Sequence, residues 1–385
     1  MPAPDLRSLF LLDPDVVFLN HGSFGATPKP IFDVYQMWQR RLEWQPVQFL
    51  VHDLTEHLAD ARQQLGAFIN APADDLVYVP NATFGVNVVA HSLSLRPGDE
   101  VLTTNHEYGA CNNTWTYYSR KHGFRYVRQP IALPVTSDAE IIEAFWQGVT
   151  PRTKVIFLSH MSSSTAVTLP VAPICARARE MGILTVVDGA HMLGQSPLDM
   201  DAIGADFYTS NAHKWLCSPK GAAFLYVRPD VQHLVEPLVV GWGWGDEQTF
   251  TFGSSFLDTQ QWLGTQDLAA YLSVPAAIQF QVDYGWTAVR QQCHDLLTET
   301  ITRVCDLTGL HSIYGSDQFY SQMGVMPLPP LDGQALKQCL LDEFRVEAPV
   351  VDWNGRHFIR ISVQGYNNQA DLDILLHALG VLVPV

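Results

Sequence analysis

Basic residues are scarce in this sequence. Its 385 residues include 23 lysines and arginines against 39 aspartates and glutamates, which gives a formal net charge of −16. Nucleic acids and anionic membranes are bound by clustered lysines and arginines, so we expect neither as a partner. A small anionic ligand is not excluded, because it needs only a local pocket.

Paired cysteines and long apolar runs are lacking as well. No two cysteines form a Cys-x-x-Cys pair, so no zinc site, other metal site or redox motif is indicated. No apolar run approaches the roughly 20 residues that span a bilayer, and residues 1–10 do not resemble a signal peptide. We therefore expect a cytoplasmic protein with reduced cysteines. The cysteines are Cys111, Cys175, Cys217, Cys293, Cys305 and Cys339.

Apolar residues, in contrast, are plentiful, at 47% of the chain against 16% charged residues. Short, nearly continuous apolar runs alternate with longer helical segments, which predicts an α/β domain with a mainly parallel sheet. The predicted strands are residues 76–79, 100–103, 155–158, 184–187, 207–210 and 223–227. The predicted helices between them include residues 54–68, 85–92 and 173–181.

The pattern changes after about residue 265. A long amphipathic helix over 268–284 leads to a second helix over 287–308, and strands at 324–327 and 358–363 precede a final helix over 370–379. These elements predict a smaller C-terminal α+β domain. We expect a large domain over residues 15–264 and a small domain over 265–385 together with 1–14.

Two charged residues follow predicted strands. Asp188 comes directly after residues 183–187, and Lys214 follows the strand at 207–210. Ligands of open α/β sheets bind beyond the carboxyl ends of the strands, so both residues point to one crevice. A lysine amine forms a Schiff base with an aldehyde cofactor. Pyridoxal 5′-phosphate (PLP) then acts as an electron sink when an aspartate keeps its pyridine nitrogen protonated.

This pair therefore predicts a PLP enzyme that acts at the α-carbon of an amino acid. A strand-end aspartate is often only a helix cap, and a His-Lys pair is usually a solvated surface feature. Lys220 is a rival for Lys214, although its turn-like surroundings, Ser-Pro-Lys-Gly, favour exposure.

A phosphate site is also indicated. Residues 81–85, Asn-Ala-Thr-Phe-Gly, follow a predicted strand and open a helix, whose free N–H groups and positive dipole end attract phosphate. A simple N-cap is the alternative. Ala82 and Thr83 lie at this turn, and three further contacts are candidates for the same phosphate, namely Asn211, His213 and the pair Gly264-Thr265.

These residues resemble the class V aminotransferases, which are fold-type I PLP enzymes. The strongest matches are residues 187–191, Val-Asp-Gly-Ala-His, and 206–215, which end in Asn-Ala-His-Lys-Trp. The resemblance covers nearly the whole chain. It extends to residues 20–25, residues 106–110, Gly264-Thr265, Arg360-Ile-Ser and Tyr366-Asn367.

The resemblance implies a role for each matched residue. Tyr108 corresponds to the ring that stacks on the cofactor, and His191 to the residue that contacts the ring hydroxyl. Thr265 corresponds to a phosphate contact from the neighbouring subunit, which implies a homodimer with shared active sites. Arg360 corresponds to the arginine that grips the substrate α-carboxylate, as a guanidinium fork can.

The resulting candidate site has three groups of residues. The catalytic candidates are Lys214, Asp188 and Tyr108. The cofactor-binding candidates, beyond these three, are Ala82, Thr83, His160, His191, Asn211, His213, Gly264 and Thr265. The substrate-binding candidates are Arg360, Asn20 and His21. The segment over residues 38–49, rich in Trp and Arg, is a candidate for the subunit interface.

Within the family, the chain is most similar to the isopenicillin N epimerase branch, on residues 160–165, Trp242-Gly-Trp244 and 346–349. This implies deprotonation of Cα and reprotonation on the other face. Lys214 is one acid–base group, and the other is Tyr108, His21, His160 or a water. The chain reads Ser-Thr-Ala at 164–166 where the branch has Pro-Thr-Gly. It also has Gln266 where the branch has arginine. Both differences bear on the substrate more than on the cofactor.

A carbon–sulfur lyase is the main alternative. A desulfurase needs a mobile cysteine in a loop shortly before Arg360, and residues 344–353 contain none; the nearest is Cys339. A persulfide mechanism is therefore disfavoured, whereas β-elimination needs no such cysteine and stays open. Transamination also stays open but needs a second substrate. A silent PLP-binding scaffold is disfavoured because the lysine, the aspartate, the phosphate site and the arginine are all present.

Overall fold

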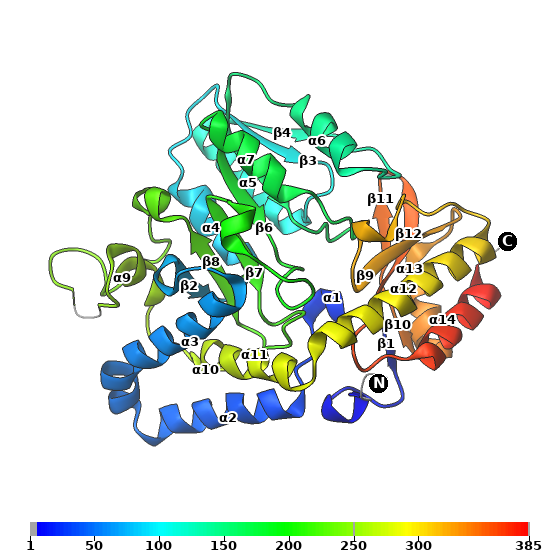
Figure 1. Cartoon of the computed structure of the whole chain (residues 1–385), viewed down its shortest axis with the longest axis horizontal. Helices are drawn as coiled ribbons and strands as arrows, with labels where there is room; N and C mark the ends of the chain where they lie inside the picture. The colour runs from blue at the N-terminus through cyan, green and yellow to red at the C-terminus, as the bar shows by residue number, and fades with distance from the viewer. Residues whose placement is uncertain (1–5, 249–250, 384–385) are drawn as a thin grey trace.

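A computed structural model describes residues 6–248 and 251–383 of the chain (Figure 1). Within those residues, one sheet contains seven strands in the order β2-β8-β7-β6-β5-β3-β4. Every neighbouring pair is parallel except the two that involve β8. The expected mainly parallel sheet is therefore confirmed. Its strands are β2 (Leu76–Val79), β3 (Glu100–Thr104), β4 (Arg125–Gln129), β5 (Thr153–Ser159), β6 (Leu184–Asp188), β7 (Phe207–Asn211) and β8 (Ala223–Val227).

All six predicted strands of the large domain are present in this sheet. Strands β2 and β8 have the predicted bounds, β3, β6 and β7 extend by one residue, and β5 extends by three. Strand β4 was not predicted. It lies at the edge of the sheet, where Arg125 and Arg128 are exposed and the chain lacks a continuous apolar run.

Helices cover this sheet and lead into the site. Helix α4 (Ala82–Ser92) packs against β6, β7 and β8. This close approach requires glycine at position 85, where a Cβ would lie 2.4 Å from Thr209 Oγ1. The other helices of this region are α2 (Lys29–Trp44), α3 (Leu54–Ile69), α5 (Gly109–His122), α6 (Asp138–Trp146), α7 (Val171–Glu180), α8 (Met200–Ile203) and α9 (Ser255–Gln261).

A smaller α+β unit follows, coloured yellow to red in Figure 1, as the sequence predicts. Its antiparallel sheet has the order β11-β12-β9. The N-terminal segment reaches this unit, because β1 (Val17–Phe18) pairs with β10 (Val346–Glu347). The remaining elements are β9 (Met323–Leu328), β11 (Val350–Trp353), β12 (Arg356–Ser362), α12 (Trp286–Thr308), α13 (Gly333–Phe344) and α14 (Gln369–Leu382). The domain boundary at residues 264 and 265 stays a prediction.

The prediction of a single helix over residues 268–284 is wrong. The chain forms α10 (Ala269–Leu272) and α11 (Val274–Asp283), separated at Ser273. Pro275 lies in the first turn of α11, and because proline has no N–H it cannot continue the hydrogen bonds of a preceding helix. The Ser273 hydroxyl instead donates to the Ala269 carbonyl.

Within the described ranges, no helix is both long and apolar enough to cross a membrane.

Candidate active site

A cavity of about 410 Å³ opens where strands β5, β6 and β7 end. That volume suits a small ligand. The cavity brings together most of the predicted cofactor residues from segments far apart in the sequence. Its lining is Ser23, Phe24, Asn81, Ala82, Thr83, Tyr108, Ser159, Met161, Ser163, Asp188, Ala190, His191, Asn211, His213 and Lys214.

Lys214 supplies a primary amine to this cavity. Its Nζ lies 3.2 Å from His191 Nε2. Burial lowers the pKa of Lys214 to about 8, a shift that the nearby positive charge of Arg360 reinforces and the negative charge of Asp188 opposes. The same burial, together with the Lys214 charge, holds the pKa of His191 well below its usual value. Lys214 is therefore easily deprotonated, and only the neutral amine can attack an aldehyde.

Asp188 supplies a buried carboxylate at the end of β6. Its side chain is 3% exposed. Oδ1 accepts from the Ala190 N–H at 2.9 Å, and Oδ2 accepts from Cys111 Sγ at 3.3 Å. Burial raises the pKa of Asp188, while these hydrogen bonds and the Lys214 charge act in the opposite direction. The carboxylate retains acceptor capacity for one more cationic N–H.

The N-terminus of α4 forms a third part of the cavity. The Asn81 side chain caps the helix by accepting from the Phe84 N–H at 2.9 Å. Asn211 Oδ1 accepts from the Ala82 N–H, also at 2.9 Å. Thr83 lies between these two contacts and lines the cavity. The positive end of the helix dipole makes this turn suitable for an anion.

Arg360 is not part of the cavity lining and is only 7% exposed, but it is hydrogen-bonded to two serines of that lining. Its Nη2 donates to Ser23 Oγ at 2.9 Å and its Nη1 donates to Ser163 Oγ at 3.2 Å, and both serines line the cavity. Burial lowers its pKa to about 10, which leaves it charged at neutral pH. Among the described residues, Arg360 forms no ion pair and its buried Nε has no hydrogen-bond partner. A carboxylate ligand would satisfy this guanidinium.

Several predicted residues lie outside the cavity lining. His160 Nδ1 lies 2.9 Å from the Tyr208 hydroxyl. Both ring nitrogens of His21 have protein partners, the Tyr366 hydroxyl at 3.0 Å and the Lys214 carbonyl at 2.9 Å. His21 therefore supports the backbone of the lysine. The other predicted residues outside the lining are Arg360, Asn20, Gly264 and Thr265. The Asn20 amide donates to Glu347, and Thr265 is exposed.

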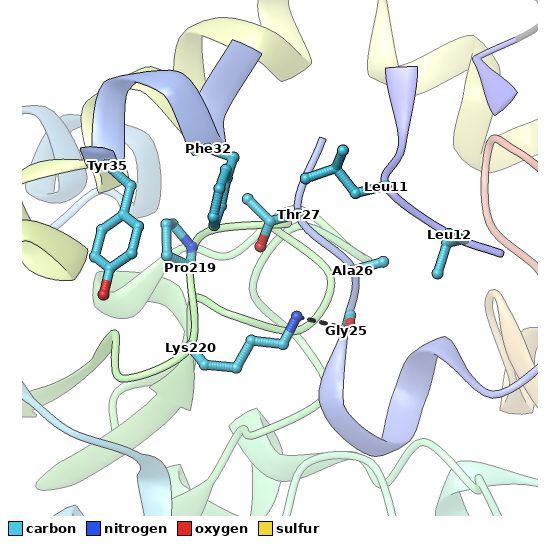
Figure 2. A pocket seen from close by; sticks show the side chains of 9 residues that line it. All are labelled: Leu11, Leu12, Gly25, Ala26, Thr27, Phe32, Tyr35, Pro219 and Lys220. Carbon is cyan, nitrogen blue, oxygen red and sulfur yellow. Dashed lines mark hydrogen bonds between the residues drawn. The ribbon is translucent and has the colours of Figure 1, made fainter. Parts of the chain in front are cut away.

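Lys220, the rival lysine, lines a separate cavity of about 300 Å³, shown in Figure 2. Its Nζ donates to the Gly25 carbonyl at 3.1 Å. That lining contains apolar side chains such as Phe32 and Leu12 and no carboxylate. Lys214 is thus the lysine that shares a cavity with Asp188.

Sequence reasoning did not single out several residues of the site, among them Ser23, Cys111, Ser159 and Ser163. The sequence could have indicated Ser23, because this residue belongs to residues 20–25, which match the family. Cys111 contacts Asp188 from helix α5, a tertiary contact that no local pattern reports.

An amine can link to an aldehyde, a carboxylate can pair with a protonated ring nitrogen, and a helix N-terminus can bind a phosphate. PLP carries all three of these groups. This arrangement, on an α/β fold, is the one that a fold-type I PLP enzyme requires. Residues 45–375 match the family model of class V aminotransferases, and the chain belongs to that family. PLP is accordingly its cofactor, as the sequence predicts.

Two named relatives and a solved structure are similar over nearly the whole chain. Isopenicillin N epimerase of Amycolatopsis lactamdurans is 35% identical over 97% of this chain and 96% of its own. A probable chloroplastic L-cysteine desulfhydrase of Arabidopsis thaliana is 29% identical over 96% of this chain and 84% of its own. The cystine C-S lyase C-DES, solved with its product cysteine persulfide, has a TM-score of 0.85 at 23% identity, covering 96% of this chain and 99% of its own. That identity shows a shared fold. The predicted resemblance to the epimerase branch is confirmed.

Proposed function

We propose that this enzyme removes the α-proton of an amino acid, or of a substrate that contains one, and returns a proton to the other face of that carbon. The observation that carries the proposal is one cavity that holds Lys214 and Asp188, with Arg360 bound to Ser23 and Ser163 of its lining and the pKa of Lys214 lowered to about 8 by burial. The 35% identity with an isopenicillin N epimerase supports the same reaction.

Each of these residues has a distinct task in the proposal. Bound PLP supplies an electron sink for the charge left at Cα. Lys214 would hold the cofactor through its aldehyde, and the Lys214 amine would take the proton from one face of Cα. Asp188 holds the proton at the ring nitrogen, and Arg360 fixes the substrate carboxylate so that Cα faces Lys214.

Tyr108 is our candidate for the second acid–base group. Epimerisation needs a proton donor on the face opposite Lys214. Of the three side chains considered from the sequence, only Tyr108 lines the cavity, whereas both ring nitrogens of His21 and Nδ1 of His160 contact other protein groups. We propose that the Tyr108 hydroxyl donates this proton.

A carbon–sulfur lyase is the second candidate. The similarity to an L-cysteine desulfhydrase favours it, and β-elimination starts with the same loss of the α-proton. Residues 345–353 contain no cysteine and include strands β10 and β11, which gives no support to a persulfide mechanism.

A homodimer with shared sites is also part of the proposal. Thr265, the expected phosphate contact from a partner subunit, is exposed and lies outside the cavity of its own chain. Large apolar side chains are exposed as well, including Phe24 at 72% and Trp44, within the segment over 38–49, at 90%. In the proposed dimer, the partner subunit would cover such side chains. A cytoplasmic location stays a prediction.

The reaction is tested by incubating the PLP-loaded enzyme in deuterated water with amino acids. The panel includes L-cysteine, cysteine sulfoxides and an α-aminoadipyl peptide, and NMR follows Cα–H exchange, chirality and pyruvate. We expect exchange with inversion and no pyruvate. Pyruvate together with released sulfur would establish the lyase instead.

Shared sites are tested by mixing subunits. A heterodimer of Lys214→Ala and Thr265→Asp subunits has one site with both defects and one with neither. Mixing the two inactive variants is therefore expected to restore activity. No recovery despite heterodimer formation would contradict a contribution from the partner.

A further inference from the structure

A second buried carboxyl, Glu107, lies beside Asp188 and has no role in the reaction described so far. Its side chain is 6% exposed. Oε1 accepts from the Thr104 hydroxyl at 2.6 Å. Oε2 accepts from Ser159 twice, from its N–H at 2.7 Å and from its hydroxyl at 2.6 Å. Within the described chain, Glu107 forms no ion pair with lysine, arginine or histidine.

The sheet brings Glu107 close to Asp188. Ser159, which holds Glu107, is the direct neighbour of Asp188 in the pairing of β5 with β6. Adjacent strands lie about 4.8 Å apart, and paired residues direct their side chains to the same face. Cys111 completes the group, because its thiol donates to Asp188, and burial together with the charges of both carboxyls raises its pKa.

This arrangement is costly for the protein alone. A buried carboxylate without a cation destabilises the fold, and a neutral side chain of the same size would avoid that cost. Burial, reinforced by the charge of Asp188, raises the pKa of Glu107 to about 7, while its three hydrogen-bond donors favour the anion. Among the described residues, three donors stabilise a negative charge on Glu107 and no ion pair balances it.

We propose that Glu107 is a positioning residue for the cofactor, whose carboxylate adds a second negative charge beside Asp188 and so stabilises the protonated pyridine nitrogen. The inference rests on the proposed function, in which Asp188 holds that proton. The ring cation supplies the balancing charge, so each buried anion strengthens the binding of the protonated ring.

The test compares Glu107→Gln with the wild type, both loaded with PLP that carries ¹⁵N in the ring. Glutamine can keep its oxygen toward Ser159 and turn its NH₂ toward the Thr104 hydroxyl, so the fold is expected to persist. The ¹⁵N shift of the ring is expected to move toward the unprotonated value. PLP affinity is expected to fall roughly ten-fold or more, as loss of one neighbouring charge predicts.

Tyr126→Phe is the matched control, because Tyr126 lies near Glu107, carries no charge and donates to Asn112. It is expected to leave the ring shift and PLP affinity unchanged. If Glu107→Gln does not fold, Thr104→Val removes one donor from Glu107 and is expected to cause smaller changes in the same direction.

Two results are decisive. A wild-type ring shift and wild-type affinity in Glu107→Gln, or in Thr104→Val if that variant is needed, would overturn the role of Glu107 while leaving that of Asp188 intact. An unprotonated ring in the wild type would instead contradict Asp188 and, with it, the proposed function.

Discussion

Tyr108 is 47% exposed and lies at the N-cap of helix α5, on the wall of the cavity. Tyr108→Phe removes only the hydroxyl. If that hydroxyl returns the proton on the face opposite Lys214, inversion should fall about 100-fold or more, the usual effect of losing a general acid. Cα–H exchange should persist, because Lys214 still removes and returns the proton on its own face.

The two rates can be measured in one experiment in deuterated water, with exchange followed by NMR and inversion by chiral chromatography. An equal loss of exchange and inversion in Tyr108→Phe would contradict a specific role on the second face.

Arg360 allows a test of substrate binding that spares the cofactor. Arg360→Ala is expected to raise KM by about ten-fold to a hundred-fold, since hydrogen bonds to charged groups contribute about 1.5–3 kcal/mol. The absorbance of the bound cofactor should not change. Arg356→Ala is the control, because Arg356 lies on the same strand, is exposed and stacks over Phe358. An unchanged KM in Arg360→Ala would refute the carboxylate contact.

The sequence could predict Lys214 and Asp188 because each follows a buried apolar strand, a local pattern. It could not predict that Ser23 and Ser163 hold Arg360, because those contacts join residues 337 and 197 positions apart. The same limit applies to His21, whose placement behind the lysine depends on Tyr366.

Among the elements, helix α4 is the one that, in the proposed function, links folding to cofactor binding. Asn81 accepts from the Phe84 N–H as an N-cap and also lines the cavity. Asn81→Ala should lower the free energy of unfolding of the cofactor-free protein by about 1 kcal/mol, the usual loss for an N-cap. It should also weaken PLP binding, since the exposed N–H groups of this turn would no longer be held in place.

Ser137→Ala is the matched control. Ser137 caps helix α6 by accepting from the Glu140 N–H and does not line the cavity. The Ser137→Ala variant should lose a similar amount of unfolding free energy, measured by urea unfolding, and should keep the PLP affinity of the wild type. Equal affinities in both variants would mean that the start of α4 does not bind the cofactor.

Elements were predictable where burial is uniform along the strand, as in β2 and β8, whose four and five residues are all buried. Strand β4 was not predicted because it is an edge strand, whose exposed and half-buried residues do not form a continuous apolar run. The prediction of one helix over 268–284 was wrong because the amphipathic spacing continues past Pro275, whereas the backbone hydrogen bonds of the helix are interrupted there.

At the scale of the whole molecule, buried imidazoles make stability depend on pH. Burial lowers the pKa of His106 to about 4, opposed by the Ile131 carbonyl. The unfolded chain binds this proton near pH 6.5, so the contribution of His106 is complete above that pH and is lost as pH falls toward 4.

His106→Gln should therefore flatten the pH dependence of stability. Relative to the wild type, its loss of unfolding free energy between pH 6.5 and 5 should be smaller by up to about 2 kcal/mol. The measured quantity is the difference in unfolding free energy between the variant and the wild type. Both proteins contain Glu107, whose raised pKa makes stability increase as pH falls, opposite to the effect of His106. If urea unfolding gave the same dependence of unfolding free energy on pH for His106→Gln and the wild type, the buried, neutral state of His106 would be contradicted.

The central claim is that Lys214 holds PLP in the cavity that contains Asp188. Borohydride reduction of the PLP-loaded enzyme, followed by proteolysis and mass spectrometry, locates the lysine that carries the reduced cofactor. The account predicts a pyridoxyl group on Lys214 and none on Lys220, with no reducible cofactor in Lys214→Ala and normal labelling in Lys220→Ala. A pyridoxyl group on Lys220, or stable labelling of Lys214→Ala at another lysine, would contradict it.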